Sequence, residues 1–115
     1  MTVENIFNNF AKKYGDDFNW GIIPDDKKEY FVNELKKESG QENIILNNKI
    51  YAIARSYSDD EVLYILENDS GEKLYRIYHL TYSVRNTDDF PKYTEFPDIF
   101  TAGKYIEKKF INEYL

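Results

Sequence analysis

Apolar residues recur at helical spacing near the beginning of the chain, and polar residues occupy the positions between them. The apolar positions are Val3, Ile6, Phe7, Phe10, Ala11 and Tyr14. Thr2 is a suitable N-cap residue for such a helix, and Gly15 is a suitable residue to end it. The pattern therefore predicts an amphipathic helix whose apolar stripe packs against the core.

A second helical pattern begins at Pro24, whose fixed backbone angle suits the first turn of a helix. Asp25 and Asp26 strengthen the prediction, because negative side chains near an N-terminus complement the helix dipole. The apolar stripe and the stop signal that complete this pattern are Phe31, Val32, Leu35, Ser39 and Gly40. Trp20 lies in the connector between the two helices, where it is either a buried anchor or a residue that stacks on a ligand.

The middle of the chain contains three strand patterns, which cover Lys49–Tyr57, Glu61–Glu67 and Lys73–Ser83. The first is rich in β-formers and alternates with a period of two, and the second is apolar on both faces in its middle. In the first of them, Ile50, Ala52 and Ala54 are predicted to share one face of the sheet. The connections at Ser58–Asp60 and Asn68–Gly71 are short turns, so an antiparallel meander is the simplest topology.

The third strand pattern is unusual because bulky side chains fall on both of its faces. One face carries Leu74, Tyr78, Leu80 and Tyr82, and the other carries Tyr75, Ile77, His79 and Thr81. A sheet with one wet face shows a clean alternation of apolar and polar residues, which is blurred here. Either helices cover both faces of this sheet, or helices cover one face and a partner covers the other.

Two segments have no clear periodicity. Gln41–Asn48 reads as a polar loop, in which a short strand within Asn43–Leu46 stays an open alternative. Val84–Asp98 is a long irregular loop, and its aromatic residues suggest that it is pinned across the sheet. After it, Thr101 is the expected cap of a final helix. The apolar stripe of that helix is Ala102, Ile106, Phe110 and Tyr114.

These elements predict one α+β domain over residues 1–115. It has two N-terminal helices, an antiparallel meander sheet of three to four strands and a C-terminal helix packed on the sheet. The length of 115 residues fits a single domain with one core. No apolar run approaches the ~20 residues of a membrane-spanning helix, and the N-terminus does not resemble a secretory signal. A cytoplasmic location is therefore expected.

Charge narrows the classes of partner. Lys and Arg total 15 against 21 Asp and Glu, which gives a formal net charge of -6. This charge repels nucleic-acid backbones and anionic membranes, and it favours a basic protein partner. The chain has no cysteine and a single histidine, so neither a disulfide nor a cysteine-ligated zinc site is available. No cofactor motif or metal-ligand spacing occurs, and we predict no cofactor and no catalytic residue.

His79 is the residue around which a small hydrolase or ligand-binding site would form. Its candidate neighbours are Thr81, Tyr75 and Arg55. A catalytic histidine needs a nucleophile or a carboxylate in reach, and no nucleophile elbow or glycine-rich oxyanion loop is present. A structural histidine, hydrogen-bonded within the sheet, is the alternative interpretation.

The chain resembles a group of small bacterial proteins with a Trp-Gly-x-x-Pro segment, a helix of the form Phe-x-x-Glu-Leu, and a strand that ends in His-Leu-Thr-Trp-Ser. The matching residues here are Trp20, Gly21 and Pro24, then Phe31, Glu34 and Leu35, and finally His79, Leu80, Thr81, Tyr82 and Ser83. Tyr82 stands where that pattern has Trp. In its small, acidic α+β form the group is similar to immunity proteins that neutralise bacterial toxins, and the resemblance implies such a role.

The leading hypothesis is an interaction module, most concretely an immunity-type inhibitor that occludes a basic surface of a cognate toxin. Carboxylates would stand in for phosphates, and tyrosines would anchor the partner. The candidate contact residues are Asp59, Asp60, Glu61, Asp69, Asp88, Asp89, Tyr57 and Tyr93. The site around His79 and a homodimer through an exposed sheet face are the alternatives.

Overall fold

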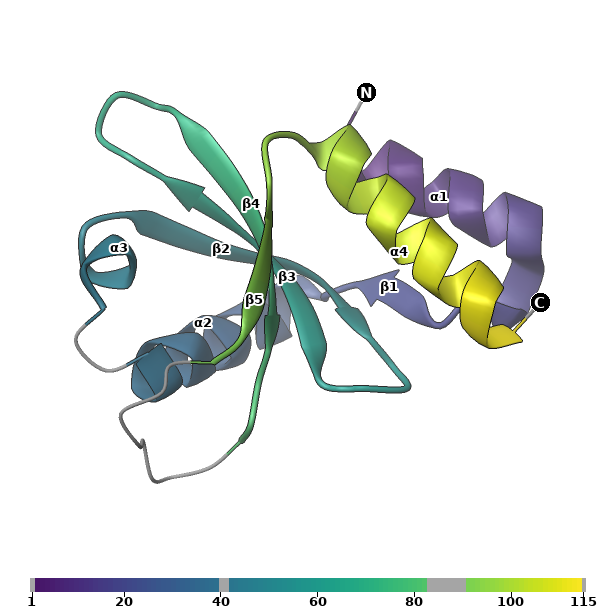
Figure 1. The fold of residues 1–115 in the computed structure, drawn as a ribbon, viewed down its shortest axis with the longest axis horizontal. Coiled ribbons are helices and arrows are strands. Elements are labelled where there is room, and N and C mark those ends of the chain that lie inside the picture. Colours follow the sequence, from purple (N-terminus) through teal and green to yellow (C-terminus); the bar gives the residue numbers. More distant parts are fainter. Residues whose placement is uncertain (1, 40–41, 83–90, 115) are drawn as a thin grey trace.

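A computed structural model describes residues 2–39, 42–82 and 91–114. It contains a five-stranded antiparallel sheet in the order β1-β2-β3-β4-β5, with helices on both sides (Figure 1). The strands are β1 Trp20–Ile22, β2 Lys49–Ser56, β3 Glu61–Glu67, β4 Lys73–His79 and β5 Tyr93–Phe96. The helices are α1 Val3–Tyr14, α2 Asp25–Ser39, α3 Asn43–Leu46 and α4 Ile99–Tyr114, with a short 3₁₀ turn at Gly15–Asp17. In these described ranges, no helix combines the length and the apolar character that crossing a bilayer requires.

The α+β class, an N-terminal helix, an antiparallel meander sheet and the C-terminal helix are confirmed. Strand β1 lies between α1 and α2, so the two helices do not follow each other directly as predicted. The predicted count of three to four strands is wrong, because the sheet has five. The short strands β1 and β5 were missed since three or four residues are too few to display a period, and β5 lies within the segment predicted to be an irregular loop. The polar loop contains the single helical turn α3, so the short strand considered there is wrong. β4 ends at His79, so Leu80, Thr81 and Tyr82 lie beyond the strand that was predicted to continue to Ser83.

Helix ends follow the expected chemistry at α1. The Oγ1 atom of Thr2 accepts a hydrogen bond from the Asn5 amide at 3.2 Å, and Gly15 ends the helix with φ +68°. At α4 the predicted cap is wrong. Asp98 precedes the helix, and its Oδ1 accepts from both the amide and the hydroxyl of Thr101 at 2.8 Å, so Thr101 lies inside the first turn.

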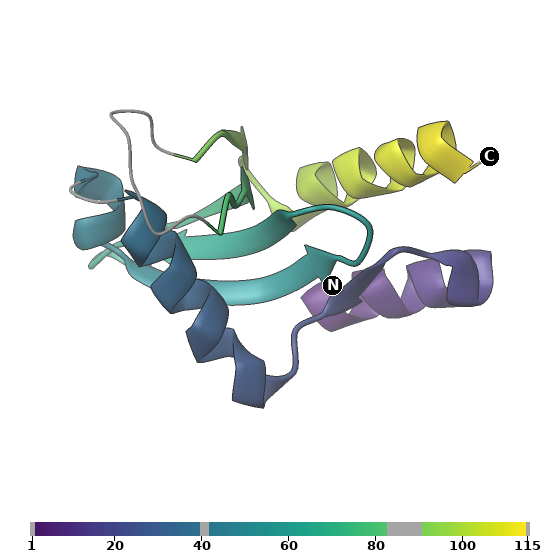
Figure 2. The ribbon, with the colours of Figure 1, turned by 90° about the horizontal axis from the view of Figure 1, so that it is seen from below.

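Helices α1 and α4 pack side by side on one face of the sheet, whereas α2 lies on the other (Figures 1 and 2). The core under the helix pair is almost entirely apolar and includes Phe7, Phe10, Phe18, Leu63, Ile77, Ile106 and Phe110. The core under α2 includes Phe31, Leu35, Val62, Tyr64, Leu66, Tyr78 and Leu80. Both faces of the third strand pattern are therefore covered by helices over part of their length. Ala11, which was predicted to lie in the stripe of α1, is exposed instead.

A β-bulge in β2 changes which side chains share a face. Ala52 pairs with Tyr64 and Ala54 pairs with Leu63, which leaves Ile53 as an extra residue between them. As a result Ala52 packs under α2, whereas Ala54 packs under α1 and α4. The prediction that Ile50, Ala52 and Ala54 share one face is therefore wrong, because uninterrupted alternation cannot anticipate a bulge.

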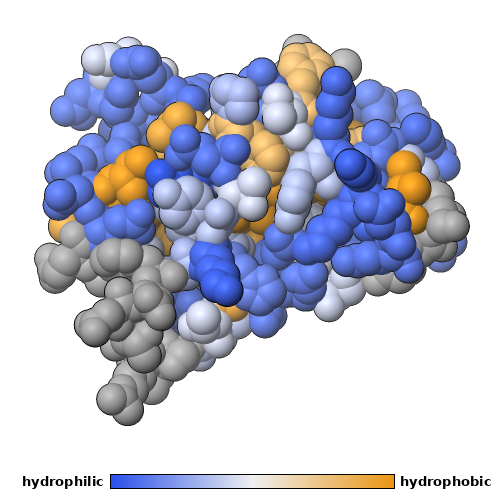
Figure 3. Space-filling view, in the orientation of Figure 1, coloured by the Kyte–Doolittle hydropathy of each residue, from blue (hydrophilic) through white to orange (hydrophobic). Residues whose placement is uncertain are grey.

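The helix pair does not cover the whole of its sheet face. In Figure 2 the pair lies towards one end of the molecule and α2 towards the other. Among the described residues, the part of this face that carries Tyr51 and Ile65, towards the Asn68–Gly71 turn, is left uncovered, because Tyr51 is 43% exposed and Ile65 is half-buried. Apolar residues reach the surface between that turn and the helix pair (Figure 3).

Candidate protein-binding surface

Three exposed tyrosines lie around one arginine near the turn between β2 and β3. Tyr30 is 57% exposed, Tyr57 is 60% exposed and Tyr82 is 38% exposed. They come from α2, from the residue after β2 and from the segment after β4. Tyr57 lies over Arg55, and Tyr82 is close enough to Asp60, Tyr30 and Arg55 to interact electrostatically with all three. We call these five residues the tyrosine surface. Tyrosines are common in protein interfaces because each ring offers apolar area together with a hydrogen-bonding tip.

Arg55 joins the tyrosine surface to the core. Its guanidinium carbon lies 5.0 Å from the ring centroid of Tyr57 and 5.6 Å from that of the buried Phe31. The Phe31 ring in turn meets the Tyr30 ring edge-on, with centroids 5.1 Å apart. Arginine over an aromatic face is attractive because the ring quadrupole is negative there. The exposed tyrosines therefore rest on a supporting layer.

Gly21 makes room for Tyr57. A Cβ atom at this position would lie 2.0 Å from the Tyr57 hydroxyl, which is closer than any real contact. The Tyr57 amide also donates to the carbonyl of Asn19 at 2.7 Å, and so ties the end of β2 to the segment before β1. The glycine of the Trp20-Gly21 dipeptide therefore allows the Tyr57 ring to lie across the edge of the sheet.

Tyr82 is fixed by a buried carboxylate. Glu38, in the last turn of α2, is only 1% exposed. Its Oε1 accepts from the Thr81 amide at 2.6 Å and from the Thr81 hydroxyl at 2.8 Å, and its Oε2 accepts from the Tyr82 amide at 2.9 Å. Tyr82 adopts φ +54°, a left-handed conformation that is uncommon for a residue with a Cβ atom. The Glu38 bonds offset the cost of this conformation.

Glu34 lies one helical turn before Glu38 and forms a carboxyl pair with it. Its side chain is 6% exposed, its Oε1 lies 3.2 Å from Lys37 Nζ, and its Oε2 is buried without a donor among the described residues. The hydrogen bond to Glu38 and burial together raise the pKa of Glu34. Burial would raise the pKa of Glu38 too, but hydrogen bonds from Glu34, Thr81 and Tyr82 outweigh it and lower the pKa. These opposite shifts mean that Glu34 keeps a proton to a higher pH than Glu38, and while it is protonated it can donate a hydrogen bond to the Glu38 carboxylate.

The tyrosine hydroxyl of Tyr82 stays protonated in ordinary buffers. Burial raises its pKa to about 12, and the negative charge of Asp60 adds to the shift. The hydroxyl can therefore donate a hydrogen bond to a partner. Sequence reasoning placed Tyr57, Asp60 and Arg55 in candidate sites but missed Tyr30, Tyr82 and the two glutamates. The signal for the glutamates was their position at i and i+4 next to the apolar stripe of α2.

Two of the predicted acidic contacts are neutralised within the protein. Glu61 is buried and forms an ion pair with Lys109 of α4, and Lys109 Nζ also lies 3.3 Å from Asp59 Oδ2. The Tyr105 hydroxyl donates to Glu61 Oε2 at 3.2 Å. Burial alone would lower the pKa of Lys109, but Glu61 and Asp59 outweigh it and raise the pKa. These carboxylates brace α4 against the β2–β3 turn, so they have less charge to offer a partner.

The other predicted contact residues do not lie together. Asp69 is exposed in the turn at the far end of β3, ~20 Å from Glu61 at 3.3 Å per residue. Tyr93 on β5 is 46% exposed, and its ring centroid lies 3.9 Å from the guanidinium carbon of the buried Arg76. Asp88 and Asp89 fall outside the described residues. The structure thus brings together only Tyr57 and Asp60 from this set within the tyrosine surface.

The alternative site around His79 is spread over the sheet. His79 is exposed at the end of β4, opposite Glu61. Tyr75 lies four residues earlier, ~13 Å along the strand, and packs against the core under α1 and α4. Arg55 lies over Phe31, at the core under α2, and Thr81 bonds to Glu38. These residues lie on both sides of the sheet, so they do not form the compact group that acid–base chemistry requires.

Comparison with known proteins adds no further constraint. No protein-family model matches the chain, and no significant match occurs among curated proteins or among solved structures. The resemblance to small bacterial proteins and to immunity proteins in form is not tested by these comparisons and stays a prediction.

Proposed function

We propose that this protein is an interaction module that binds a basic protein partner through the tyrosine surface. The most concrete form of this role is an immunity-type inhibitor that occludes a basic surface of a toxin. The observation that supports the proposal is the gathering of Tyr30, Tyr57 and Tyr82, all exposed, around Arg55. Large aromatic side chains held on a rigid support are the usual anchors of protein interfaces.

Affinity would come from the rings. The Tyr57 ring contacts Arg55, the Tyr30 ring contacts Phe31 and the Tyr82 backbone bonds to Glu38, and these contacts lower the entropy that ordering the three residues would cost on binding. A partner that covers the three rings buries apolar area and can bond to the hydroxyls. Asp60, exposed beside Tyr82, is the carboxylate placed to meet a basic side chain of that partner.

Charge would speed the encounter. The net charge of -6 attracts a basic partner over distances that contacts cannot reach. The carboxylates of Asp69, Asp88 and Asp89 contribute to this field whether or not they touch the partner. Since Asp59 and Glu61 are paired with Lys109, we assign them to support of the β2–β3 turn rather than to direct contact.

The test is a binding titration against the toxin domain encoded beside this protein's gene. Tyr57→Ala combined with Tyr82→Ala is expected to raise Kd by roughly a hundredfold, as for two interface anchors. Tyr51→Ala is the matched control, since Tyr51 is 43% exposed but lies on the uncovered half of the sheet. The absence of any neighbouring toxin gene in related genomes would contradict the proposal. So would an equal rise in Kd in the double variant and in the Tyr51→Ala control.

A further inference from the structure

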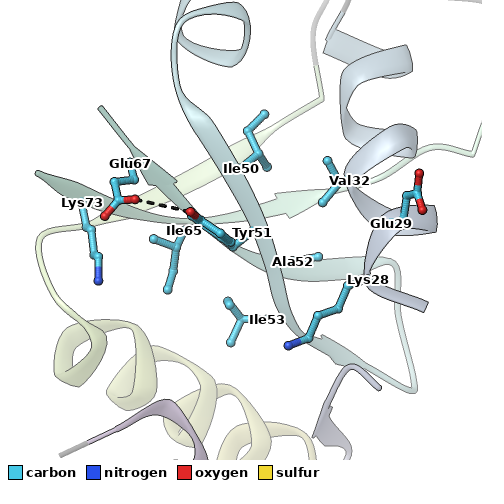
Figure 4. Close-up of a pocket in the computed structure, with 10 residues that line it drawn as sticks. All are labelled: Lys28, Glu29, Val32, Ile50, Tyr51, Ala52, Ile53, Ile65, Glu67 and Lys73. Atoms are coloured by element: carbon cyan, nitrogen blue, oxygen red, sulfur yellow. Dashed lines mark hydrogen bonds between the residues drawn. The ribbon is translucent and has the colours of Figure 1, made fainter. Parts of the chain in front are cut away.

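The uncovered half of the sheet contains a groove at the edge of β2. One cavity of about 410 Å³ lies between the first half of α2 and this strand, and a second of about 310 Å³ adjoins it. Both are lined by Lys28, Ile53, Ile65 and Lys73. Figure 4 shows Val32 and Glu29 of α2 on one side of β2 and Ile65 with Lys73 on the other, so the hollow wraps around the strand. We call it the edge groove.

Along this groove, the edge of β2 that faces away from β3 has no strand partner among the described residues. β1 pairs only with Ala54, Arg55 and Ser56, and the Ile23 amide donates to the Ile53 carbonyl at 2.9 Å. Within the described residues, Lys49–Ala52 has a strand neighbour on the β3 side alone. Alternate backbone N–H and C=O groups of an edge strand point away from the sheet and are ready to pair with another extended chain.

We propose that the edge groove binds an extended peptide segment, which adds a strand to β2 alongside Lys49–Ala52. Backbone hydrogen bonds would supply affinity that does not depend on sequence, and alternate side chains would enter the cavities on either side of β2. This site shares no residue with the tyrosine surface, so the inference is independent of the proposed function.

Geometry selects a peptide over a folded partner. The free edge spans residues 49–52, about 13 Å of extended chain, and it ends where β1 begins to pair. The side chains of Lys28, Glu29 and Val32 from α2 form a wall beside it. A strand inside another sheet would bring its own neighbours against α2 and β1, whereas a single extended segment fits between them.

The charges that line the larger cavity are balanced, so we expect that segment to carry apolar side chains. The lysines that line the larger cavity, Lys28 and Lys73, are balanced by Glu29 and Glu67. Lys28 Nζ already lies 3.1 Å from Asp25 Oδ1, and Glu67 accepts a hydrogen bond from Tyr51 at 3.4 Å. The larger cavity therefore has no excess charge for an ionic ligand, and Val32, Ile53 and Ile65 offer apolar contact.

The probe is a pool of fluorescein-labelled heptapeptides in which Val, Ile, Leu or Phe alternate with Thr or Ser. The matched control pool is N-methylated at alternate residues, which removes the ladder hydrogen bonds and keeps the side chains. We expect the unmodified pool to bind with Kd below ~1 mM and the control to bind at least about tenfold more weakly. Bound peptide should also slow hydrogen exchange at the amides of 49–52.

Two variants locate the site. Val32→Tyr fills the groove and is expected to weaken peptide binding at least about tenfold, whereas Tyr57→Ala should leave it unchanged. Equal binding of both pools, no binding at ~1 mM, or protection at β5 instead of β2 would overturn the proposal. Concentration-dependent dimerisation without peptide, with the same amides protected, would assign the edge to a second copy of the chain and equally overturn it. The peptide controls decide the question even if Val32→Tyr fails to fold.

Discussion

The two sides of the sheet hold the molecule together in different ways. Under α1 and α4 the core is an apolar cluster that includes several phenylalanines, and the ring centroids of Phe18 and Phe110 lie 5.1 Å apart. We call this the dry side of the sheet, and the side under α2 the polar side. Under α2 the core contains buried polar groups, among them Glu38 and Arg76. Aromatic packing is not directional, so it stabilises the fold without fixing the position of a particular exposed residue. A buried carboxylate accepts directional hydrogen bonds, so it fixes the backbone groups that donate to it. The tyrosine surface lies over the polar side.

Several buried polar groups on the α2 side have hydrogen-bond partners. The Tyr64 hydroxyl, which is buried, donates to the Phe31 carbonyl at 2.7 Å. Arg76 donates to Glu95 at 2.8 Å and to the Tyr78 hydroxyl at 2.7 Å. Since these groups have their partners, the cost of burying them is offset, and they connect α2, β3, β4 and β5. Helix α2 is therefore the element that connects the buried polar groups to the tyrosine surface.

The largest effect is expected on the dry side. Phe110→Ala removes a ring that is 2% exposed and that packs against Tyr14 and Phe18. The free energy of unfolding should fall by about 4 kcal/mol, as for other large-to-small substitutions of a buried aromatic residue. Chemical denaturation measures this loss. The folded variant should keep the amide chemical shifts of Thr81 and Tyr82, and a large change in those shifts would show that the two sides are not separate.

Glu38→Ala should give the next largest loss of stability and also alter the tyrosine surface. The substitution leaves the Thr81 and Tyr82 amides without their acceptor, which lowers the free energy of unfolding by about 3 kcal/mol. Glu34→Ala is the matched control on the same helix, because Glu34 bonds to neither amide. If denaturation showed the same loss of stability in both variants, the hydrogen bonds that Glu38 accepts from the Thr81 and Tyr82 amides would not be the cause of the loss.

The pH dependence of stability should have opposite signs at the two glutamates. The pKa of Glu34 is raised, so its contribution is complete below the unfolded value of 4.5 and is lost as pH rises through the folded pKa. The pKa of Glu38 is lowered, so its contribution is present above 4.5 and is lost as pH falls through its folded pKa. Stability measured against pH should therefore rise and then fall across this pair.

Glu34→Gln separates the two contributions. Its amide can donate to Glu38 without a titrating proton, so the loss of stability on the alkaline side of 4.5 should disappear while the acid loss remains. Urea denaturation across a series of pH values checks this. An unchanged alkaline loss in Glu34→Gln would mean that Glu34 is not the proton donor.

The smallest effect on stability is expected at Gly21. Gly21→Ala places a methyl group against the Tyr57 hydroxyl, at the free end of an exposed and movable side chain. We expect the free energy of unfolding to change by less than about 0.5 kcal/mol, because the ring can swing away into solvent. Partner affinity should nevertheless fall, since Tyr57 is displaced from Arg55. A normal affinity would remove Tyr57 from the binding surface.

The dry side could be predicted from the sequence to a greater extent than the polar side. The helical repeat predicted α1 with both of its ends, because apolar periodicity reports burial directly, and an apolar run between two turns predicted β3. A buried glutamate contradicts that rule. Glu34 and Glu38 look like solvent-facing residues of an amphipathic helix, and their role depends on Thr81 and Tyr82, which lie more than forty residues away. The ion pair of Lys109 with Asp59 and Glu61 could not be predicted for the same reason, because its partners lie far apart in the sequence.

The measurement that tests the central claim most directly is the amide NMR spectrum of Thr81 and Tyr82 in the wild-type protein and in Glu38→Gln. In the wild type both amide protons should lie downfield and exchange slowly, because each donates to a buried carboxylate. In Glu38→Gln both should move upfield and exchange faster, while the amides of Leu63 and Ile77 on the dry side stay unchanged. Amides of Thr81 and Tyr82 that exchange rapidly in the wild type, or that ignore the substitution, would contradict the claim that α2 holds the tyrosine surface in place.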